Sequence, residues 1–251
     1  MSELAERPPI ASAPLSVLLL VQDAEAYLEG VAGAWIASLD ALGQDYELIC
    51  IDDGSADQTA AVAEKLVSGH PRLRLLRHPI RRGPGAALRT GLEAACHPLV
   101  LYTVAGRQYR PADLGLFRQW IDKVDLVAGY RPRPCRTRPW KEALYRGFVR
   151  VIFGVRLRDV NCWYLLARRA IFRRIPLQAN SSFAHAEILA KANFLGHLLT
   201  EVPVAYQPIS GGEGWANRLG FRQTLAEASQ VFSDPDFGPP FLPDDTRAPA
   251  C

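Results

Sequence analysis

The stretch 46–59 reads YELICIDDGSADQT and decides the fold class. Its first half is a largely apolar run of strand length, and the pair Asp52 and Asp53 follows directly. Carboxylates at the end of a buried strand are costly unless they accept hydrogen bonds or face a ligand. We therefore predict a buried strand that delivers both carboxylates to a binding site, where they accept hydrogen bonds from donors such as a base N–H or a ribose hydroxyl.

The residues after this pair have a second explanation. Ser55 and Asp57 are of the types that cap helices, and an acidic residue is favourable near a helix N-terminus. We assign Asp57 and Thr59 to capping of the next helix. Ligand contact stays with Asp52 and Asp53.

Strand-like and helix-like segments alternate on both sides of this stretch. Strands are expected over 15–21, 46–52, 73–77, 99–103, 125–129, 159–166 and 198–204. Helices are expected over 24–42, 56–67, 86–95, 114–124, 140–153, 182–195 and 216–232. This alternation predicts an α/β fold with a mostly parallel sheet covered by helices on both faces and a site at the carboxyl ends of the strands.

Composition places the chain among globular proteins. Its 251 residues are 49% hydrophobic and 22% charged, which suits a large folded domain. The longest apolar run, 15–21, is far shorter than the roughly 18 residues of a membrane-spanning helix. Five scattered cysteines without a Cys-x-x-Cys pair argue against a disulfide framework and a zinc site. An acidic N-terminus argues against a signal peptide, so we predict a cytoplasmic protein.

Five ordered elements resemble family-2 glycosyltransferases of the GT-A fold. The segment 52–59 is similar to the family's Asp-Asp-Gly-Ser-x-Asp-x-Thr, and 81–91 to its glycine-rich turn. The segment 99–114 resembles the strand that carries a metal-binding Asp-x-Asp. Asp-x-x-Cys at 159–162 and Glu-Val-Pro-Val-x-Tyr at 201–206 resemble the polyprenyl-phosphate branch, which is similar to dolichyl-phosphate mannosyltransferases.

The resemblance implies a domain organisation and a reaction. A GT-A-like domain would span 15–214, with a nucleotide half at 15–130 and an acceptor-side half at 131–214. A loose tail at 1–14, a helix within 215–232 and a proline-rich tail at 233–251 would flank it. The implied reaction moves a sugar from a nucleotide diphosphate-sugar to a polyprenyl-phosphate acceptor. The implied donor-binding residues are Asp23, Glu25, Asp52, Asp53, Arg81, Gly83, Gly85 and Arg107.

The metal motif is replaced. Where the family has Asp-Ala-Asp, this chain has Val104, Ala105 and Gly106, whose side chains offer no oxygen to magnesium or manganese. Arg107, Arg81 and Arg82 suggest that arginines neutralise the donor's diphosphate in place of a metal, so that no metal is required. The alternatives are that magnesium or manganese binds through other ligands, or that Arg107 lies on a degenerate surface loop. A non-catalytic pseudo-glycosyltransferase that serves as a binding or regulatory subunit is the corresponding functional alternative.

The sequence offers no obvious catalytic base. The resemblance implies Asp159 near the acceptor and Glu187 on a later helix. Asp159 could equally end a strand and pair with Arg158 or Arg168. His185 and Glu187 are two residues apart and so do not share a helical face; we expect no metal pair there.

Positive charge is concentrated between residues 131 and 158, which hold nine basic residues and one acid. Such a segment attracts anions or is simply a solvated face. The helix expected over 140–153 carries an apolar stripe beside Lys141, Arg146 and Arg150, a pattern typical of contact with anionic lipid heads. We predict that these three residues bind a lipid phosphate, with peripheral membrane contact and no nucleic-acid partner. The alternative is a stripe that packs on the sheet.

Overall fold

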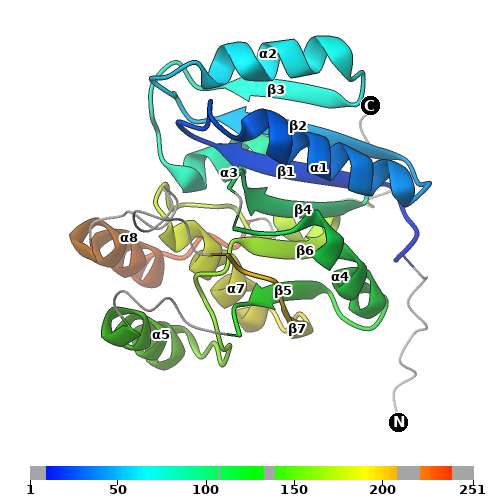
Figure 1. Ribbon diagram of the computed structural model, residues 1–251. Coiled ribbons are helices and arrows are strands. Elements are labelled where there is room, and N and C mark those ends of the chain that lie inside the picture. Colours follow the sequence, from blue (N-terminus) through cyan, green and yellow to red (C-terminus); the bar gives the residue numbers. More distant parts are fainter. Residues whose placement is uncertain (1–9, 107, 133–138, 208–220, 239–251) are drawn as a thin grey trace.

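The computed structural model describes residues 10–106, 108–132, 139–207 and 221–238, without the side chains of 139–142 and 221–222. One seven-stranded sheet runs through the molecule in the order β3-β2-β1-β4-β6-β5-β7 (Figure 1). Its strands are β1 (Leu15–Val21), β2 (Tyr46–Asp52), β3 (Leu73–Arg77), β4 (Leu99–Val104), β5 (Leu126–Tyr130), β6 (Tyr164–Arg168) and β7 (Leu199–Pro203). Only β6 among them runs antiparallel to its neighbours.

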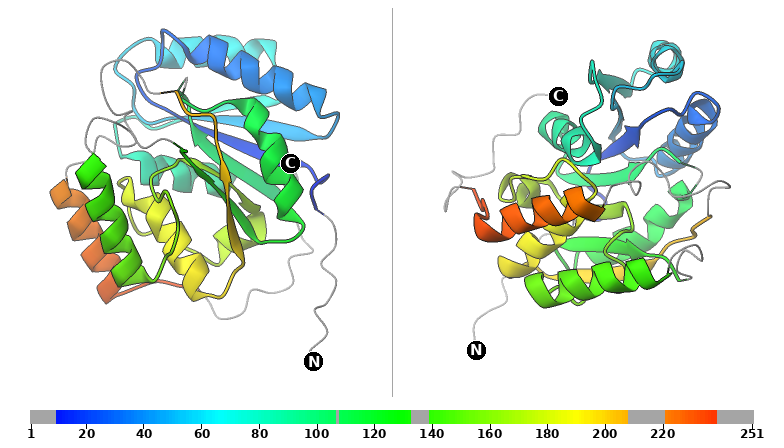
Figure 2. Two further views of the ribbon diagram at one scale, coloured as in Figure 1. Left: turned by 60° about the horizontal axis from the view of Figure 1, so that its bottom comes forward. Right: turned by 90° about the vertical axis from the view of Figure 1, so that its left-hand side faces the viewer.

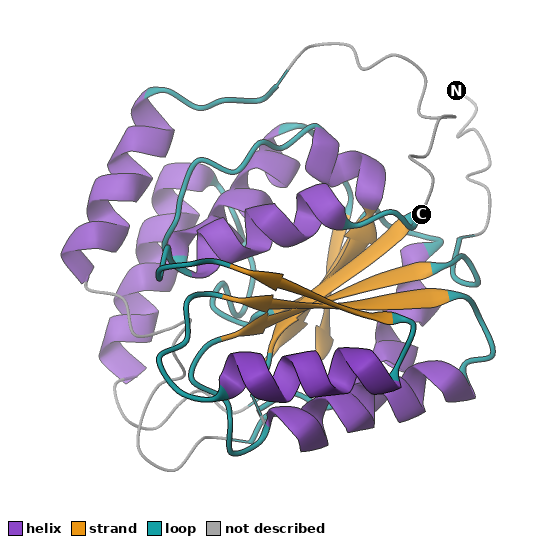
Figure 3. Ribbon diagram, turned by 90° about the horizontal axis from the view of Figure 1, so that it is seen from above, coloured by secondary structure: helices purple, strands orange, loops and turns teal. Residues whose placement is uncertain are grey.

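Helices cover both faces of the sheet (Figure 3). They are α1 (Leu28–Ala41), α2 (Thr59–Gly69), α3 (Pro84–Ala94), α4 (Leu114–Ile121, after a 3-10 turn at Pro111–Asp113), α5 (Pro139–Phe153), α6 (Arg169–Arg173), α7 (Phe183–Phe194) and α8 (Phe221–Ser233). The predicted α/β class with a mostly parallel sheet is confirmed.

The inner strands β1, β2 and β4 are buried along their whole length. Apolar residues occupy both faces of these strands, as expected where helices cover a parallel sheet on both sides. On one face, Trp35 of α1 and Phe117 of α4 pack against Tyr164, with ring centroids 6.0 and 4.7 Å apart. On the other face, Tyr102 meets His185 of α7. The sheet is therefore the centre of a three-layer core.

Helix α7 is a buried central helix. Its residues from Phe183 to Ala192 are all buried, because α3, α5 and α8 pack around it. Figure 2 shows α5 and α8 side by side as an outer layer, and Phe153 and Phe232 join them with ring centroids 6.1 Å apart.

Several boundaries differ from the prediction. Helix α1 begins at Leu28 instead of residue 24, because the backbone of 23–25 bonds to the 55–59 loop. Strand β6 begins at Tyr164 instead of residue 159, because Asp159 accepts the N–H of Asn161 in a turn.

Parts of both expected tails are attached to the domain. Ala11 donates its N–H to Asp122 Oδ1 at 2.9 Å, and Arg118 donates to the Ala11 carbonyl. Near the other end, Phe237 stacks on Phe194 with centroids 4.9 Å apart, and Asp236 donates its N–H to Gln178 Oε1. Residues 1–9 and 239–251 lie outside the described part of the chain.

Candidate functional site

The register of the parallel strands brings four strand ends together. Val21 of β1 pairs with Asp52 of β2, Asp52 with Arg77 of β3, and the residue before Val21 with Val104 of β4. The loops after β1, β2, β3 and β4 therefore meet at one edge of the sheet. This edge is where an open parallel sheet binds its ligand.

Asp52 ends β2 with one carboxylate oxygen engaged and one without a hydrogen bond. Oδ1 accepts the backbone N–H of Ser55 at 3.1 Å and its hydroxyl at 2.5 Å. Oδ2 is buried and accepts no hydrogen bond, although Arg77 Nε lies 3.5 Å away. An acceptor left open in a buried site at the binding edge is suited to a ligand's N–H or hydroxyl.

Asp53 is fully engaged by the protein. Its Oδ1 accepts the N–H of Arg82 and faces His78 Nδ1 at 2.8 Å, and Oδ2 accepts the N–H of Gly83 at 2.8 Å. The side chain is 0% exposed. Asp53 thus fixes the loop that follows β3 instead of presenting an open acceptor.

Asp23 and Glu25 hold the same loop from the other side. Asp23 Oδ1 accepts the N–H of Ala56 at 2.9 Å, and Glu25 Oε2 accepts that of Gln58 at 2.7 Å. Asp23 does so with φ at +45°, a left-handed conformation that Asp tolerates better than most residues. Both side chains therefore reach the predicted edge, where they fasten the loops after β1 and β2 together.

The glycine-rich turn permits close packing of two loops. Gly83 has φ at +101°, and a Cβ there would lie 2.4 Å from the Asn180 carbonyl oxygen. A Cβ on Gly85 would lie 2.4 Å from the Ala179 oxygen, and Gly85 donates its N–H to Asn180. The N–H groups of both glycines are satisfied inside the protein, by Asp53 and Asn180. Arg81 and Arg82 are exposed beside this turn.

The place of the metal motif does not suit a divalent cation. Val104 ends β4 and Gly106 follows, so no side-chain oxygen stands where the resemblance would put a ligand. Arg107, the predicted substitute, lies outside the described residues.

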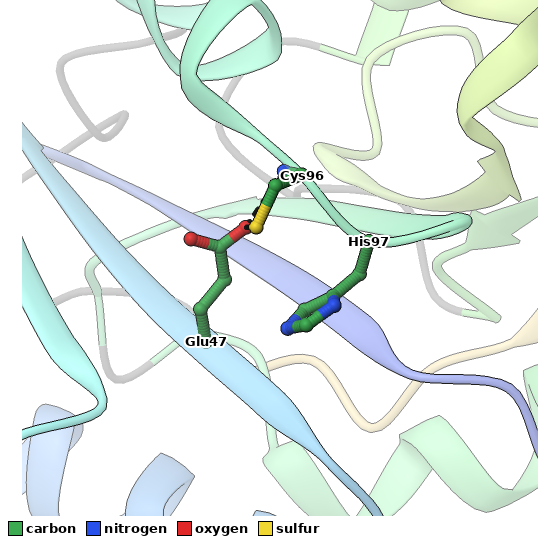
Figure 4. Close-up of side chains that lie close together, drawn as sticks. All are labelled: Glu47, Cys96 and His97. Atoms are coloured by element: carbon green, nitrogen blue, oxygen red, sulfur yellow. Dashed lines mark hydrogen bonds between the residues drawn. The ribbon is translucent and has the colours of Figure 1, made fainter. Parts of the chain in front are cut away.

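Glu47, Cys96 and His97 are the one group in the described ranges with metal-ligand spacing (Figure 4). It lies near the start of β2, at the opposite end of that strand from Asp52. Glu47 is already engaged by the Ser16 hydroxyl at 2.6 Å and by Arg74 at 2.8 Å. Glu47 Oε1 also accepts the N–H of Cys96 at 2.8 Å, so both oxygens of this carboxylate are already engaged within the protein.

The acceptor-side half contains a cavity of about 280 Å³ lined by arginines. The residues around it are Tyr130, Arg131, Pro132, Arg146, Arg158, Asp159, Val160 and Asn161. Arg131 donates to both oxygens of Asp159, at 2.6 and 2.9 Å. Arg158 stacks over Tyr130 with 4.8 Å to the ring centroid, and Arg146 donates to the Arg158 carbonyl. Three guanidinium groups against one carboxylate give the cavity an excess of positive charge.

Asp159 is poorly suited to accept a proton. Burial raises its pKa, but the hydrogen bonds and charge of Arg131 outweigh this and hold the pKa below the usual value. Its predicted alternative partners, Arg158 and Arg168, are not the ones it pairs with. Glu201 supports the loop from below by accepting the N–H groups of Arg158 at 2.8 Å and Asp159 at 3.3 Å.

Glu187 supports a loop. It is 0% exposed, accepts the N–H groups of Gln178 and Ala179 at 2.9 Å each, and pairs with Lys191 at 2.7 Å. The structure therefore places the two residues that the resemblance implied as catalytic, Asp159 and Glu187, in supporting networks.

The three residues predicted to bind the acceptor phosphate do not all lie at the arginine cavity. Arg146 lines the arginine cavity, Arg150 is exposed, and the Lys141 side chain lies outside the described residues. Sequence analysis did not assign Arg131 and Arg158 to the site. Arg131 directly follows β5, so the rule that pointed to Asp52, that strand ends meet at one edge, would have found it.

His185 makes stability depend on pH. Burial lowers its pKa from 6.5 to about 4, so the folded protein holds it neutral. Between these two values the unfolded chain binds more protons, and stability therefore falls as the pH drops from 6.5 toward 4. The loss is on the order of 3 kcal/mol. His185→Phe should flatten that part of a urea-unfolding pH profile. His70→Gln, at a half-buried position, serves as the control. If the unfolding free energy of His185→Phe changed with pH as steeply as that of wild type, His185 would not be the source of this pH dependence.

Comparisons with known proteins agree with this geometry. Residues 25–179, more than half of the chain, match the family described as Glycosyl transferase family 2. The chain is 27% identical to glycosyltransferase AglD of Haloferax volcanii over 83% of its own length, but that match spans 36% of AglD. It is 25% identical to polyprenol monophosphomannose synthase of Mycolicibacterium smegmatis, covering 73% of this chain and 75% of that protein.

A solved structure shares the fold. Glucosyl-3-phosphoglycerate synthase from Mycobacterium tuberculosis, crystallised with Mn²⁺, UDP and phosphoglyceric acid, superposes with a TM-score of 0.69 at 20% identity. The match covers 92% of this chain and 82% of that one. The sheet order, the Asp52–Asp53 loop and the matched region lead to one conclusion: the chain belongs to glycosyl transferase family 2.

Proposed function

We propose that the protein transfers a sugar from a nucleotide diphosphate-sugar to a lipid phosphate. The observation that carries the donor assignment is Asp52 Oδ2, a buried carboxylate oxygen without a hydrogen bond at the edge where four strand ends meet. A base N–H or ribose hydroxyl would complete its hydrogen bonding. The sugar's anomeric carbon would then lie toward the acceptor-side half.

Calorimetric titration with UDP and GDP tests the donor site. Asp52→Asn should weaken binding of the preferred nucleotide by about ten- to a hundredfold, because a hydrogen bond to a charged group contributes about 1.5–3 kcal/mol. Asp57→Asn alters a residue that accepts the N–H of Thr59 in the same loop, and this variant should bind nearly as well as wild type. Failure of the wild-type protein to bind either nucleotide would overturn the proposal. Tight binding of a nucleotide-sugar without turnover on any lipid phosphate would favour the non-catalytic alternative.

The arginine cavity supports a phosphate-bearing acceptor. Its guanidinium groups can form paired hydrogen bonds to phosphate oxygens, and Glu201 and Asp159 hold the loop that presents them. The relatives include an undecaprenyl-phosphate 4-deoxy-4-formamido-L-arabinose transferase from Shewanella sediminis, 26% identical over 84% of this chain. A polyprenyl phosphate is therefore the acceptor we propose.

An exposed apolar face on α5, α7 and α8 supports contact with a lipid surface. We call its residues the outer-helix face. Ile152, Phe194 and Phe232 line one groove, Leu144 and Val151 are exposed on α5, and all five are 37–80% exposed. The apolar stripe predicted on α5 is thus partly on the surface, while Val149 packs inward. Arginines on the same helix, Arg146 and Arg150, complement anionic head groups. No helix in the described ranges is long and apolar enough to span a bilayer.

Vesicle co-sedimentation tests this face. The wild-type protein should bind phosphatidylglycerol vesicles more strongly than phosphatidylcholine vesicles. Val151→Asp, at an 80% exposed position, should weaken binding to the anionic vesicles about tenfold, because it removes apolar contact and adds a negative charge. Leu116→Asp changes a 40% exposed residue of α4 on the other side of the sheet and should have no effect. Equal loss in both variants would contradict this placement of the lipid surface.

A further inference from the structure

Gln108 carries an amide nitrogen without a partner, just after the replaced metal motif. The residue is 2% exposed, and its Nε2 makes no hydrogen bond. The backbone around it is fixed, since the Gln108 carbonyl accepts the N–H of Gln207 at 3.0 Å. A buried amide donor that is held in place but unpaired is rare in folded proteins and is suited to an incoming acceptor atom.

The side chain of Gln108 lies against Gly106. A Cβ on Gly106 would lie 3.5 Å from Gln108 Cγ and 3.6 Å from both Cδ and Oε1. Gly106 stands where the family resemblance would put a carboxylate ligand. In this chain the side chain beside that position is thus the neutral amide of Gln108. Its terminal χ3 torsion rotates easily, so that either the nitrogen or the oxygen can face Gly106.

Beside Gly106 is a cavity of about 390 Å³. Its lining includes Gly106, Tyr109 and Arg110 and no carboxylate. Gln108 is not part of the lining, although its side chain lies against Gly106, which is. The charge of Arg110 also acts on the nearby Asp113 carboxylate. A divalent cation would find no anionic ligand among these residues, whereas an anion would find the Arg110 guanidinium.

We propose that Gln108 and Arg110 bind the diphosphate of the donor directly, so that the nucleoside diphosphate is held without a divalent cation. The Gln108 amide donates a hydrogen bond to a phosphate oxygen beside Gly106, and Arg110 balances the charge from the cavity side. This inference rests on the proposed donor function, and it differs from the sequence-based expectation in assigning the role to residues other than Arg81 and Arg107.

The first test compares ligands that differ only in phosphate. UDP, GDP and their nucleosides are titrated calorimetrically with manganese and again with a chelator. The wild-type protein should bind one diphosphate equally in both conditions. Gln108→Met, of similar size, should weaken diphosphate binding about five- to tenfold and leave nucleoside binding unchanged. Equal affinity of wild type and Gln108→Met for the diphosphate would overturn the role of Gln108.

The second test restores a metal ligand. Gly106→Asp fits the available space, because its Cβ would make only ordinary van der Waals contacts. Its carboxylate should repel the diphosphate, lowering metal-free binding at least about tenfold, and manganese should restore the binding. Gly106→Asn has the same size and no charge, so manganese should not improve its binding of the diphosphate. Restoration by manganese in both variants would contradict the explanation by charge.

Two results of these titrations separate the inference from the proposed function. Wild-type binding that requires manganese would overturn direct binding of the diphosphate and leave the donor function standing. No binding of either nucleotide in either condition would overturn both.

Discussion

Asp53→Asn should destabilise the protein by roughly 1–3 kcal/mol, because it leaves a buried N–H donor without a partner. In the native protein this carboxylate accepts two backbone N–H groups, from Arg82 and Gly83, and faces His78. An asparagine has one acceptor oxygen, so at least one of these donors is left without a partner. Urea unfolding followed by circular dichroism measures the loss.

Asp57→Asn provides a graded comparison in the same loop. Asp57 accepts the N–H of Thr59 at 3.0 Å just before α2, and Asn keeps one acceptor oxygen at this position, so the loss should be about 1 kcal/mol or less. An equally small loss of unfolding free energy in Asp53→Asn and Asp57→Asn would contradict the assignment of Asp53 as the centre of the network that joins the loops after β2 and β3.

Gly83→Ala should cost roughly 2–6 kcal/mol. An alanine would have to adopt φ near +101° with ψ near 160°, and its Cβ would lie 2.4 Å from the Asn180 carbonyl oxygen. This backbone conformation is essentially restricted to glycine and costs about 1–3 kcal/mol, and forced overpacking adds about 1–3 kcal/mol. Urea unfolding gives the free energy, and nucleotide titration of the folded variant reports whether the neighbouring Asp52 site is also displaced.

Gly30→Ala is the matched control. Gly30 lies in α1 with nothing within 4 Å of an added Cβ. Alanine there should stabilise the protein by about 0.5–1 kcal/mol, because glycine is the poorer helix former. Opposite signs for the two glycine substitutions are the expected result, and a Gly83→Ala protein as stable as wild type would contradict the packing of the turn against the 178–180 loop.

The strand framework was predictable because its signal is local. Apolar runs such as 15–21 and 46–52 are long enough to form buried strands, and the polar residues after them mark the sheet edge. Boundaries were less predictable where side chains of one loop bond to the backbone of another. The delayed start of α1 depends on Ser55 and Thr59, more than thirty residues away.

Pairings in the acceptor-side half could not be predicted for a similar reason. Asp159 has cations nearby in sequence, but it pairs with Arg131, which β5 brings to the same edge. Glu187 lies on a helix that the sequence predicts correctly. Its role nevertheless depends on the backbone of 178–179, which folds back and donates two N–H groups to the Glu187 carboxylate. Gln108 belongs to no motif in the sequence, and only the structure shows that its amide nitrogen is buried without a hydrogen-bond partner.

The insertion of β6 between β4 and β5 has a consequence for synthesis on the ribosome. Strand β5 is complete at Tyr130, but its partners β6 and β7 end at Arg168 and Pro203. At about 5–20 residues per second, the chain waits roughly 4–15 s between the completion of β5 and that of β7. Until β6 is complete, β4 and β5 present unpaired backbone edges, and one edge of β5 stays open until β7 is complete. Such edges invite pairing with other chains. Nascent chains stalled within residues 131–203 should therefore depend on chaperones more than chains released after β7.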